Sequence, residues 1–237
     1  MNTIFAWSYF LLKMVTSFVP KIKINVTKKK GDYAEADRLV YDYTSNCAKG
    51  ILDKCGVKVN LVGKENLPKE ACVFVANHQG IFDMITVIAY LDRNVGFVAK
   101  KEAEKLPIVS SWMKEMHCVF LDRKNTREGL RTMNEAIENV KNGHSMFIFP
   151  EGTRSRSNKI GQFKKGSMRL AIKSEAPIVP ITVDGAYKVF EANNGKVKPE
   201  EVTLTIGKPI HTKDLNKEEL DNLADTVRNI IASNLKE

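Results

Sequence analysis

Residues 71–83, with the sequence ACVFVANHQGIFD, contain an uninterrupted apolar run, a short polar turn and the start of a second apolar segment. A continuous run such as CVFVA is typical of a strand that is buried on both faces of a sheet, since a half-exposed strand would alternate apolar and polar residues. Gly80 provides conformational freedom for a tight passage from strand to helix. This stretch therefore predicts a strand–turn–helix unit of an α/β fold.

Other short β-type runs are spread along the rest of the chain, and helical patterns lie between and after them. The helical patterns are clearest at 126–141, which Gly143 is placed to stop, and at 216–235. This alternation predicts an α/β fold with a central, mostly parallel or mixed sheet of about seven strands covered by helices. The predicted strands are 57–62, 71–76, 95–99, 118–121, 145–149, 177–183 and 202–206.

The chain length bounds the number of domains. With 237 residues, the chain suffices for one substantial domain and a small appendage. Its 43% hydrophobic and 27% charged residues are ordinary for a globular protein. We expect residues 56–237 to form the α/β domain and residues 1–55 to form N-terminal, membrane-associating helices.

The net charge of +9 favours an anionic partner, which could be nucleic acid, an acidic membrane surface or a phosphorylated substrate. RNA-binding modules typically carry strands in which aromatic residues alternate with basic ones. The sequence shows no such pattern, so a nucleic acid partner is not expected. The first acidic residue is Asp32, and six lysines precede it, which places much of the excess charge at one end. These lysines are Lys13, Lys21, Lys23, Lys28, Lys29 and Lys30.

The N-terminal segment 2–19 is mostly apolar but has only 18 residues and contains Lys13, whereas a bilayer crossing needs roughly 20 apolar residues. A cleaved signal peptide is disfavoured because positive charge and Pro20 follow the apolar stretch. We expect peripheral or monotopic attachment to anionic lipid, with a single-span anchor as the alternative.

A second amphipathic helix is expected after Asp32. Its apolar residues recur at spacings of three and four and so share one face. This face either packs on the protein core or lies with the first helix among lipid headgroups. The residues of this face are Tyr33, Ala36, Val40, Tyr43, Cys47 and Ile51.

The cysteines and histidines bear on two questions, the redox state of the compartment and the presence of a metal site. Cys47, Cys55, Cys72 and Cys118 form no CxxC arrangement, and a chain of this length does not need disulfides. A reducing setting is expected, at the cytoplasmic face of the cell membrane. Since histidines and cysteines are not clustered in the sequence, no metal site is predicted.

His78 and Asp83 stand five residues apart, directly after the strand predicted at 71–76. In α/β sheets, ligand sites gather at the carboxyl ends of strands. There the Asp83 carboxylate can accept the Nδ1 hydrogen of His78 and leave Nε2 free as a base. Backbone N–H groups near Gly80 are candidates for stabilising an oxyanion.

The usual third member of such a catalytic triad is missing from the sequence. There is no GxSxG motif and no cysteine in a comparable turn. A bound alcohol can take the place of the serine, so that His78 removes its proton and the oxygen attacks an acyl thioester. This reasoning favours acyl transfer; hydrolysis, with water in place of the alcohol, is a less favoured alternative.

Lys100, Arg123 and Arg154 each follow a predicted strand, and the planar guanidinium of arginine matches phosphate oxygens. Surface charge is the alternative explanation for each one. Glu151 can hold these cations, accept a hydroxyl or form a purely structural ion pair. Gly152 is suited to a close approach of the backbone to a ligand.

Four ordered blocks resemble the glycerolipid acyltransferase superfamily, specifically the 1-acyl-glycerol-3-phosphate acyltransferases. NHQGIFD at 77–83 resembles the catalytic His-x4-Asp block, and FLDR at 120–123 is similar to the block whose arginine binds acceptor phosphate. FPEGTRS at 149–155, which includes Thr153, resembles the block that serves acceptor binding. VPITV at 179–183, the fourth block, resembles an apolar stretch near the acyl channel. Outside the four blocks, VAKKE at 98–102 resembles a strand end whose lysine helps to bind phosphate.

The resemblance implies transfer of a fatty acyl group to the sn-2 hydroxyl of 1-acyl-sn-glycerol-3-phosphate, giving phosphatidate for phospholipid biosynthesis. The acyl donor would be acyl-CoA or acyl-acyl-carrier-protein, used as a co-substrate with no other cofactor. It also implies an N-terminal helical pair on the membrane surface. The alternatives are acylation of another lysophospholipid, glycerol-3-phosphate or an aminoacyl lipid, and a non-catalytic basic protein that binds membrane surfaces.

Two positions depart from the family pattern. The first block commonly has serine where this chain has Gly80, and the second commonly has glycine where this chain has His117. His78 and Asp83 are both retained. The departures are therefore expected to affect turn geometry or acceptor fit and to leave the reaction class unchanged.

Overall fold

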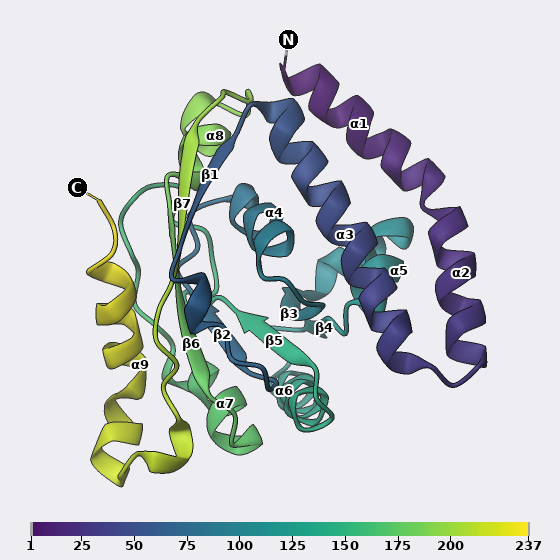
Figure 1. The fold of residues 1–237 in the computed structure, drawn as a ribbon. Coiled ribbons are helices and arrows are strands. Elements are labelled where there is room, and N and C mark those ends of the chain that lie inside the picture. Colours follow the sequence, from purple (N-terminus) through teal and green to yellow (C-terminus); the bar gives the residue numbers. More distant parts are fainter. Residues whose placement is uncertain (1, 237) are drawn as a thin grey trace.

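A computed structural model describes residues 2–236, in which strands alternate with helices (Figure 1). Seven strands occur in this part of the chain, each starting and ending within about two residues of a predicted run. The strands are β1 Lys58–Val62, β2 Val73–Ala76, β3 Val95–Lys100, β4 Val119–Leu121, β5 Ser145–Ile148, β6 Ile178–Asp184 and β7 Glu201–Ile206.

The sheet has the order β1-β7-β6-β2-β5-β3-β4. The pair β6 and β7 is antiparallel, and the other neighbouring pairs are parallel. The predicted mixed, mostly parallel sheet is thus confirmed. Since β2 to β6 all run in the same direction, their carboxyl ends lie along one edge.

Helices cover both faces of the sheet. The helices after the N-terminal segment are α4 Ile81–Tyr90, α5 Pro107–Glu115, α6 Thr126–Lys141, α7 Arg169–Ser174, α8 Ala186–Val189 and α9 Lys217–Ala232. Short 3-10 turns complete the connections at Lys64–Asn66, Lys101–Lys105, Lys165–Met168, Glu191–Asn193 and Thr212–Asp214. The helix predicted at 126–141 is α6, and Gly143 follows its end with a φ of +91°.

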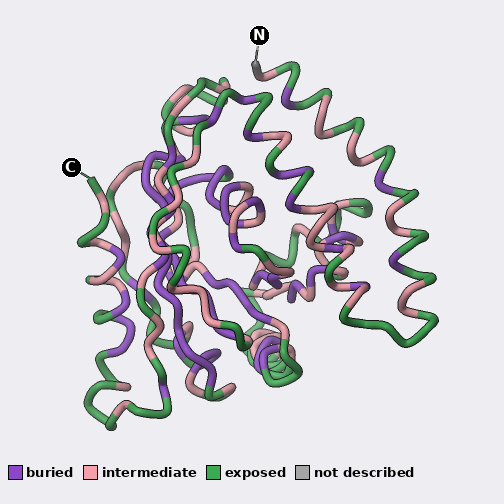
Figure 2. The backbone as a smooth tube through the Cα atoms, viewed as in Figure 1, coloured by how far each residue is buried: buried purple, intermediate pink, exposed green. Residues whose placement is uncertain are grey.

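Strand β2 contributes to a hydrophobic core on each face. Cys72, Phe74 and Ala76 belong to the core shared with α3, α4 and α5. Val73 and Val75 belong to the core shared with α6, α7 and α9. Figure 2 shows this buried interior between the helical layers. The continuous apolar sequence of the strand is therefore explained by burial on both sides.

Three helices precede the sheet: α1 Asn2–Thr16, α2 Phe18–Lys29 and α3 Tyr33–Cys55. The predicted apolar face of α3 lies largely in the core, where Ala36 and Val40 are fully buried. Tyr33, at the helix start, is 67% exposed. The core-packing interpretation of this face is confirmed, and its placement among lipid headgroups was wrong, because α3 lies between α1 and the rest of the protein (Figure 1).

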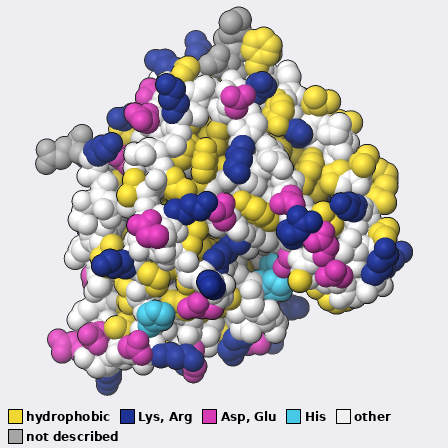
Figure 3. All heavy atoms as spheres, viewed as in Figure 1, with side chains coloured by type: hydrophobic (Ala, Val, Ile, Leu, Met, Phe, Trp, Pro, Cys, Tyr) yellow, Lys and Arg dark blue, Asp and Glu magenta, His cyan; other side chains and the backbone are white. Residues whose placement is uncertain are grey.

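Helices α1 and α2 form an outer layer. The Tyr43 hydroxyl of α3 donates a hydrogen bond to the carbonyl of Lys13 in α1 at 2.6 Å. Large hydrophobic side chains along both helices are nevertheless exposed, as the right-hand side of Figure 3 shows. They are Ile4, Phe5, Trp7, Leu11, Leu12, Val15, Phe18, Val19, Ile22 and Val26.

Within residues 2–236, no single helix has the length and apolar composition needed to cross a membrane. The pair α1 and α2, bent by 41° where the two helices meet, meets that test by length and composition when taken together.

Candidate active site

The turn from β2 to α4 brings His78 and Asp83 together. Asp83 lies in the first turn of α4, where its Oδ2 accepts the backbone N–H of Gly80 at 2.8 Å. The same oxygen lies 2.7 Å from Nδ1 of His78. A carboxylate that caps the helix thus also orients the imidazole, and Nε2 is left as the free ring nitrogen.

The environments of the two side chains differ. Asp83 is fully buried, whereas 14% of the His78 side chain is exposed. Burial raises the pKa of the Asp83 carboxyl, and hydrogen bonds from His78 and the Gly80 N–H act in the opposite direction by favouring the carboxylate. The His78 ring stacks on Phe149, with centroids 4.0 Å apart. The imidazole is therefore held by a carboxylate at one edge and an aromatic ring against its face.

The two neighbours of His78 attach the turn to β6 and to the residues after it. The Asn77 side chain exchanges two hydrogen bonds with the backbone of Val183, at 2.8 and 2.9 Å. Gln79 accepts the N–H of Ala186 at 3.1 Å and donates to Asn158 Oδ1 at 2.8 Å. Both side chains are almost completely buried. This bonding fixes the backbone on either side of the histidine.

The segment after β5 runs beside the His78 turn. The backbone N–H of Ser155 donates to the His78 carbonyl at 2.8 Å, and that of Arg156 donates to the Gln79 carbonyl at 3.1 Å. Glu151 accepts the His78 N–H at 2.7 Å and the Gly161 N–H at 2.8 Å, one with each carboxylate oxygen. The segments 77–83 and 149–155 therefore lie side by side, and the Glu151 side chain in the second bonds to the backbone of the first.

A group of cations lies around Gly152. The Arg123 guanidinium donates to the Gly152 carbonyl. Gly152 has a φ of +72°, and a Cβ built on it would lie 2.9 Å from Lys164 Nζ and 3.9 Å from Arg123 Nη1. A glycine is suited to this position because of both its left-handed backbone and the closeness of Lys164. Two cationic groups therefore converge on the turn that follows β5.

Lys100 and Thr153 occupy more peripheral places. Lys100 ends β3, and its Nζ pairs with Glu102 at 3.1 Å, with 61% of the lysine side chain exposed. Thr153 is exposed in the turn between Gly152 and Arg154. The ligand-binding roles of these residues stay predictions, and Lys164 is the lysine that the structure places beside Arg123.

Arg154 is held by Glu191, whose side chain is almost buried and which lies in the short 3-10 turn after α8. Glu191 Oε1 lies 3.2 Å from Arg154 Nη1 and accepts the N–H of Ile81 at 2.9 Å. Only 5% of the Glu191 side chain is exposed. Its Oε2 is buried and has no hydrogen-bond partner among residues 2–236.

Glu191 also explains the glycine at position 80. Gly80 has an extended backbone, with a φ of −164°, which any residue can adopt. A Cβ there would lie 2.3 Å from Glu191 Oε2. The predicted need for conformational freedom was therefore wrong, and a side chain at this position would instead require the Glu191 carboxylate to shift.

The proposed oxyanion donors near Gly80 are already engaged. The Gly80 N–H is bonded to Asp83, and the Ile81 N–H is bonded to Glu191. The prediction was wrong for these two groups, because a helix-capping carboxylate and a buried glutamate occupy them.

Comparison with known proteins agrees with this arrangement. The sequence model of the family described as Acyltransferase matches residues 58–184, which span β1 to β6 and include His78, Asp83, Arg123 and Glu151. The chain belongs to the acyltransferase family. The resemblance inferred from the four sequence blocks is thus confirmed.

Individual relatives of this member of the acyltransferase family are known. The 1-acyl-sn-glycerol-3-phosphate acyltransferase of Saccharomyces cerevisiae is 34% identical over 77% of this chain and 61% of its own length. A probable 1-acyl-sn-glycerol-3-phosphate acyltransferase of Mycoplasma pneumoniae is 31% identical over 73% of this chain and 69% of its own. The alignment thus covers less than two thirds of the yeast protein, and slightly more than two thirds of the Mycoplasma protein.

A solved structure is similar over almost the whole chain. It is the crystal structure of the 1-acyl-sn-glycerophosphate (LPA) acyltransferase PlsC from Thermotoga maritima, which matches with a TM-score of 0.82 and 26% identity. The match covers 98% of this chain and 94% of that chain. The similarity therefore includes the N-terminal helices as well as the sheet.

Sequence reasoning missed three side chains of the site in this acyltransferase family member. Phe149 was quoted within a motif but not recognised as the ring against His78. Lys164 and Glu191 lie outside all four blocks, in segments that carry no strand-end signal. Lys164 reaches the site from a loop and Glu191 from a short 3-10 turn, so only the path of the chain in space reveals them.

Proposed function

We propose that this chain transfers a fatty acyl group from a thioester to the sn-2 hydroxyl of 1-acyl-sn-glycerol-3-phosphate, giving phosphatidate for phospholipid biosynthesis. The observation that carries the proposal is the 2.7 Å contact between His78 Nδ1 and Asp83 Oδ2, in a turn next to several cations. The names of the relatives, which are 1-acyl-sn-glycerol-3-phosphate acyltransferases, support the choice of acceptor.

In the proposed reaction His78 acts as a general base. Asp83 keeps the Nδ1 hydrogen in place, so that Nε2 can take the proton of the acceptor hydroxyl. The hydroxyl oxygen then forms a bond to the thioester carbonyl carbon, and the carbon–sulfur bond breaks. The leaving thiolate receives the proton from His78, so the products are phosphatidate and a free thiol. The reaction needs two substrates and no further cofactor.

The cationic groups would bind the acceptor phosphate. Arg123 and Lys164 lie around the Gly152 turn, and Arg154 lies in the same segment, held by Glu191. A phosphate dianion bound there can accept several charge-assisted hydrogen bonds. Lys100 remains a further proposed contributor from the end of β3.

We predict that Arg123→Ala raises the KM for the acceptor by about 10- to 100-fold, because a hydrogen bond to a charged group contributes about 1.5–3 kcal/mol. The expected change in kcat is small, since the phosphate is bound equally in the ground state and the transition state. Steady-state kinetics with varied lysophosphatidate measures both constants. Lys213→Ala, which removes an exposed lysine paired with Glu175, is the control. A loss confined to kcat would contradict the phosphate assignment.

The proposed substrates can be tested by crossing donors with acceptors. Purified protein would be offered acyl-CoA or acyl-acyl-carrier-protein, each with lysophosphatidate, glycerol-3-phosphate, another lysophospholipid, an aminoacyl lipid and a phosphate-free monoacylglycerol. We expect lysophosphatidate to be acylated with the highest kcat/KM, and the donor arm identifies the carrier. Comparable use of the phosphate-free acceptor would overturn the proposed phosphate site.

We also propose that α1 and α2 attach the protein to the cytoplasmic face of the cell membrane without requiring a full crossing. The exposed hydrophobic side chains of both helices and the lysines around them support this placement (Figure 3). Such a surface can enter the boundary between headgroups and acyl chains, while lysines interact with anionic lipid. The acceptor, itself a lipid, would then be met at the membrane surface.

Leu11→Asp and Val15→Asp are predicted to weaken binding to phosphatidylglycerol vesicles by about tenfold or more each. Both side chains are more than half exposed, and full burial of such a side chain in an apolar phase contributes about 1.5–3 kcal/mol. Vesicle co-sedimentation measures the effect. Leu130→Asp, at an exposed leucine of α6, is the matched control and should bind normally. Unchanged binding by both α1 variants would refute this mode of attachment.

A further inference from the structure

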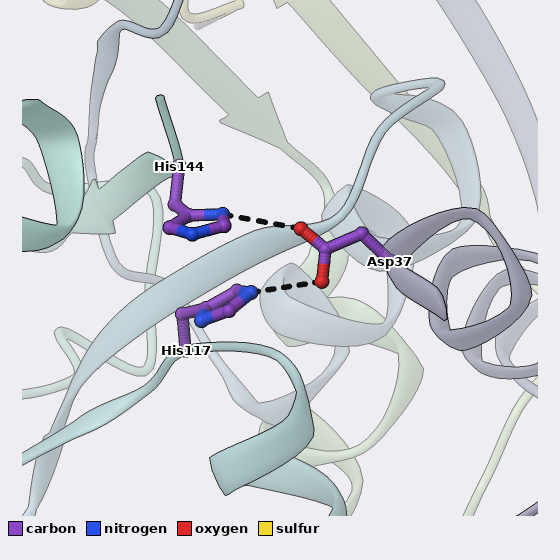
Figure 4. A group of neighbouring side chains, drawn as sticks. All are labelled: Asp37, His117 and His144. Carbon is purple, nitrogen blue, oxygen red and sulfur yellow. Dashed lines mark hydrogen bonds and ion pairs between the residues drawn. The ribbon is translucent and has the colours of Figure 1, made fainter. Parts of the chain in front are cut away.

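Asp37, His117 and His144 form a cluster away from the proposed active site (Figure 4). His117 Nε2 lies 2.9 Å from Asp37 Oδ1, and His144 Nδ1 lies 3.1 Å from Asp37 Oδ2. One potential ligand atom from each residue lies within 4.8 Å of the other two. Both histidines thus direct a ring nitrogen toward one carboxylate group.

The cluster joins the N-terminal helices to the sheet. Asp37 belongs to α3, while His117 and His144 precede β4 and β5. Because β2, β4 and β5 run in the same direction, these histidines lie at the amino ends of their strands, whereas His78 follows the carboxyl end of β2. The cluster therefore lies at the opposite edge of the sheet from the proposed reaction.

Backbone hydrogen bonds hold both histidines in place, and His117 also has an unusual backbone conformation. His117 has a φ of +61°, a left-handed value that is uncommon for residues other than glycine. Its N–H donates to the Lys114 carbonyl at 3.0 Å, and its carbonyl accepts from Asn139 Nδ2 at 3.1 Å. His144 follows Gly143 and donates its N–H to the Asn139 carbonyl at 3.0 Å. A left-handed histidine held from both sides is consistent with a specific use of its side chain.

The immediate surroundings leave one polar atom unexplained. Asn94 Nδ2 lies 3.4 Å from Asp37 Oδ1 and 3.3 Å from the Glu115 carbonyl. Its Oδ1 is buried and has no hydrogen-bond partner in the described part of the chain. The side chains of Asp37, His117 and His144 are 25%, 24% and 29% exposed, so an ion can reach them from solvent.

We propose that Asp37, His117 and His144 bind a divalent transition-metal ion, for which Zn²⁺ is the best match. Two imidazole nitrogens and one carboxylate oxygen are Zn²⁺ ligands, and water can complete a tetrahedral shell. Mg²⁺ and Ca²⁺ prefer oxygen ligands and fit less well. The stacked imidazoles, whose centroids are 3.6 Å apart, would rotate slightly so that both nitrogens face the ion. The ion would fasten α3 to the edge formed by the starts of β4 and β5.

Calorimetric titration of the chelator-treated, dialysed protein with Zn²⁺ tests the proposal. We expect saturation of this site at one ion per chain, a higher thermal unfolding midpoint with Zn²⁺, and visible absorption typical of tetrahedral Co²⁺ when cobalt replaces zinc. His144→Ala and Asp37→Asn should each weaken Zn²⁺ binding by more than about 100-fold, since loss of an outer-shell partner alone weakens binding by about 10- to 100-fold. His211→Ala, at an exposed histidine outside the cluster, should leave binding unchanged.

His117→Gly distinguishes loss of a ligand from loss of the fold. Glycine suits the left-handed backbone at position 117, so this variant should fold normally without metal. We expect it to lose Zn²⁺ binding and the Zn²⁺-dependent rise in unfolding midpoint. Failure of the unsubstituted protein to bind Zn²⁺, or binding undiminished in the folded His117→Gly variant, would overturn the proposal.

Discussion

Replacement of His78 by alanine is expected to lower the kcat for acyl transfer by about 1,000-fold or more, with little change in the Kd for lysophosphatidate. The imidazole is the proposed base, and its ring is held between Asp83 and Phe149. The proposed phosphate-binding groups, Arg123 and Lys164, lie around a different turn. Single-turnover transfer of a labelled acyl group and a separate acceptor-binding measurement distinguish these effects.

His211→Ala is the matched control for this substitution, because His211 is exposed and lies in the segment after β7. Its activity should equal that of the unsubstituted chain. The proposed mechanism fails if His78→Ala keeps near-full activity. Loss of acceptor binding in parallel with turnover would instead make His78 a binding residue.

Asp83→Asn is expected to reduce kcat by about 1,000- to 10,000-fold, although it changes the shape of the side chain very little. Oδ2 of Asp83 contacts both the Gly80 N–H and His78 Nδ1, so an asparagine places either its oxygen or its NH₂ group at that point. The oxygen lacks the negative charge that stabilises the imidazolium formed when His78 takes the proton of the alcohol, and the NH₂ group leaves the imidazole hydrogen on Nε2. The substitution thus tests the charge and hydrogen bonding of the carboxylate rather than the presence of the ring.

The Asp83→Asn measurement needs a check of folding because Asp83 is buried and caps α4. Thermal unfolding followed by circular dichroism provides it. Asp92→Asn, which alters an exposed carboxylate paired with Lys64, is the control for the loss of one negative charge. A folded Asp83→Asn variant with more than about a tenth of the original kcat would contradict the proposed role of the carboxylate.

The strands could be predicted from the sequence because each is a local pattern. Apolar runs such as CVFVA and MFIF are buried on both faces, and their boundaries are marked by polar or turn residues. The order of strands in the sheet could not be predicted in the same way. For example, β7 lies between β1, to which it is parallel, and β6, to which it is antiparallel. The end of β1 at Val62 and the start of β7 at Glu201 are separated by 138 residues of sequence.

The amphipathic helix α3 shows a different limit. Its periodic residues correctly predicted a helix with one apolar face, but periodicity does not say what covers that face. Ala36 and Val40 are covered by the protein itself, whereas the exposed apolar residues lie on α1 and α2. The difference depends on which helix is outermost, and this is decided by tertiary packing.

By itself, the sequence determined the strand–helix alternation, the His78–Asp83 spacing and the resemblance to a family, since these depend on residues close together along the chain. The tertiary structure alone decided that Glu191 and Lys164 reach the proposed active site. It also brought Asp37, His117 and His144 together, although the first two are 80 positions apart in the sequence. Such groups form where loops and helices meet around the sheet, and their contacts depend on the folded path of the chain rather than on a local repeat.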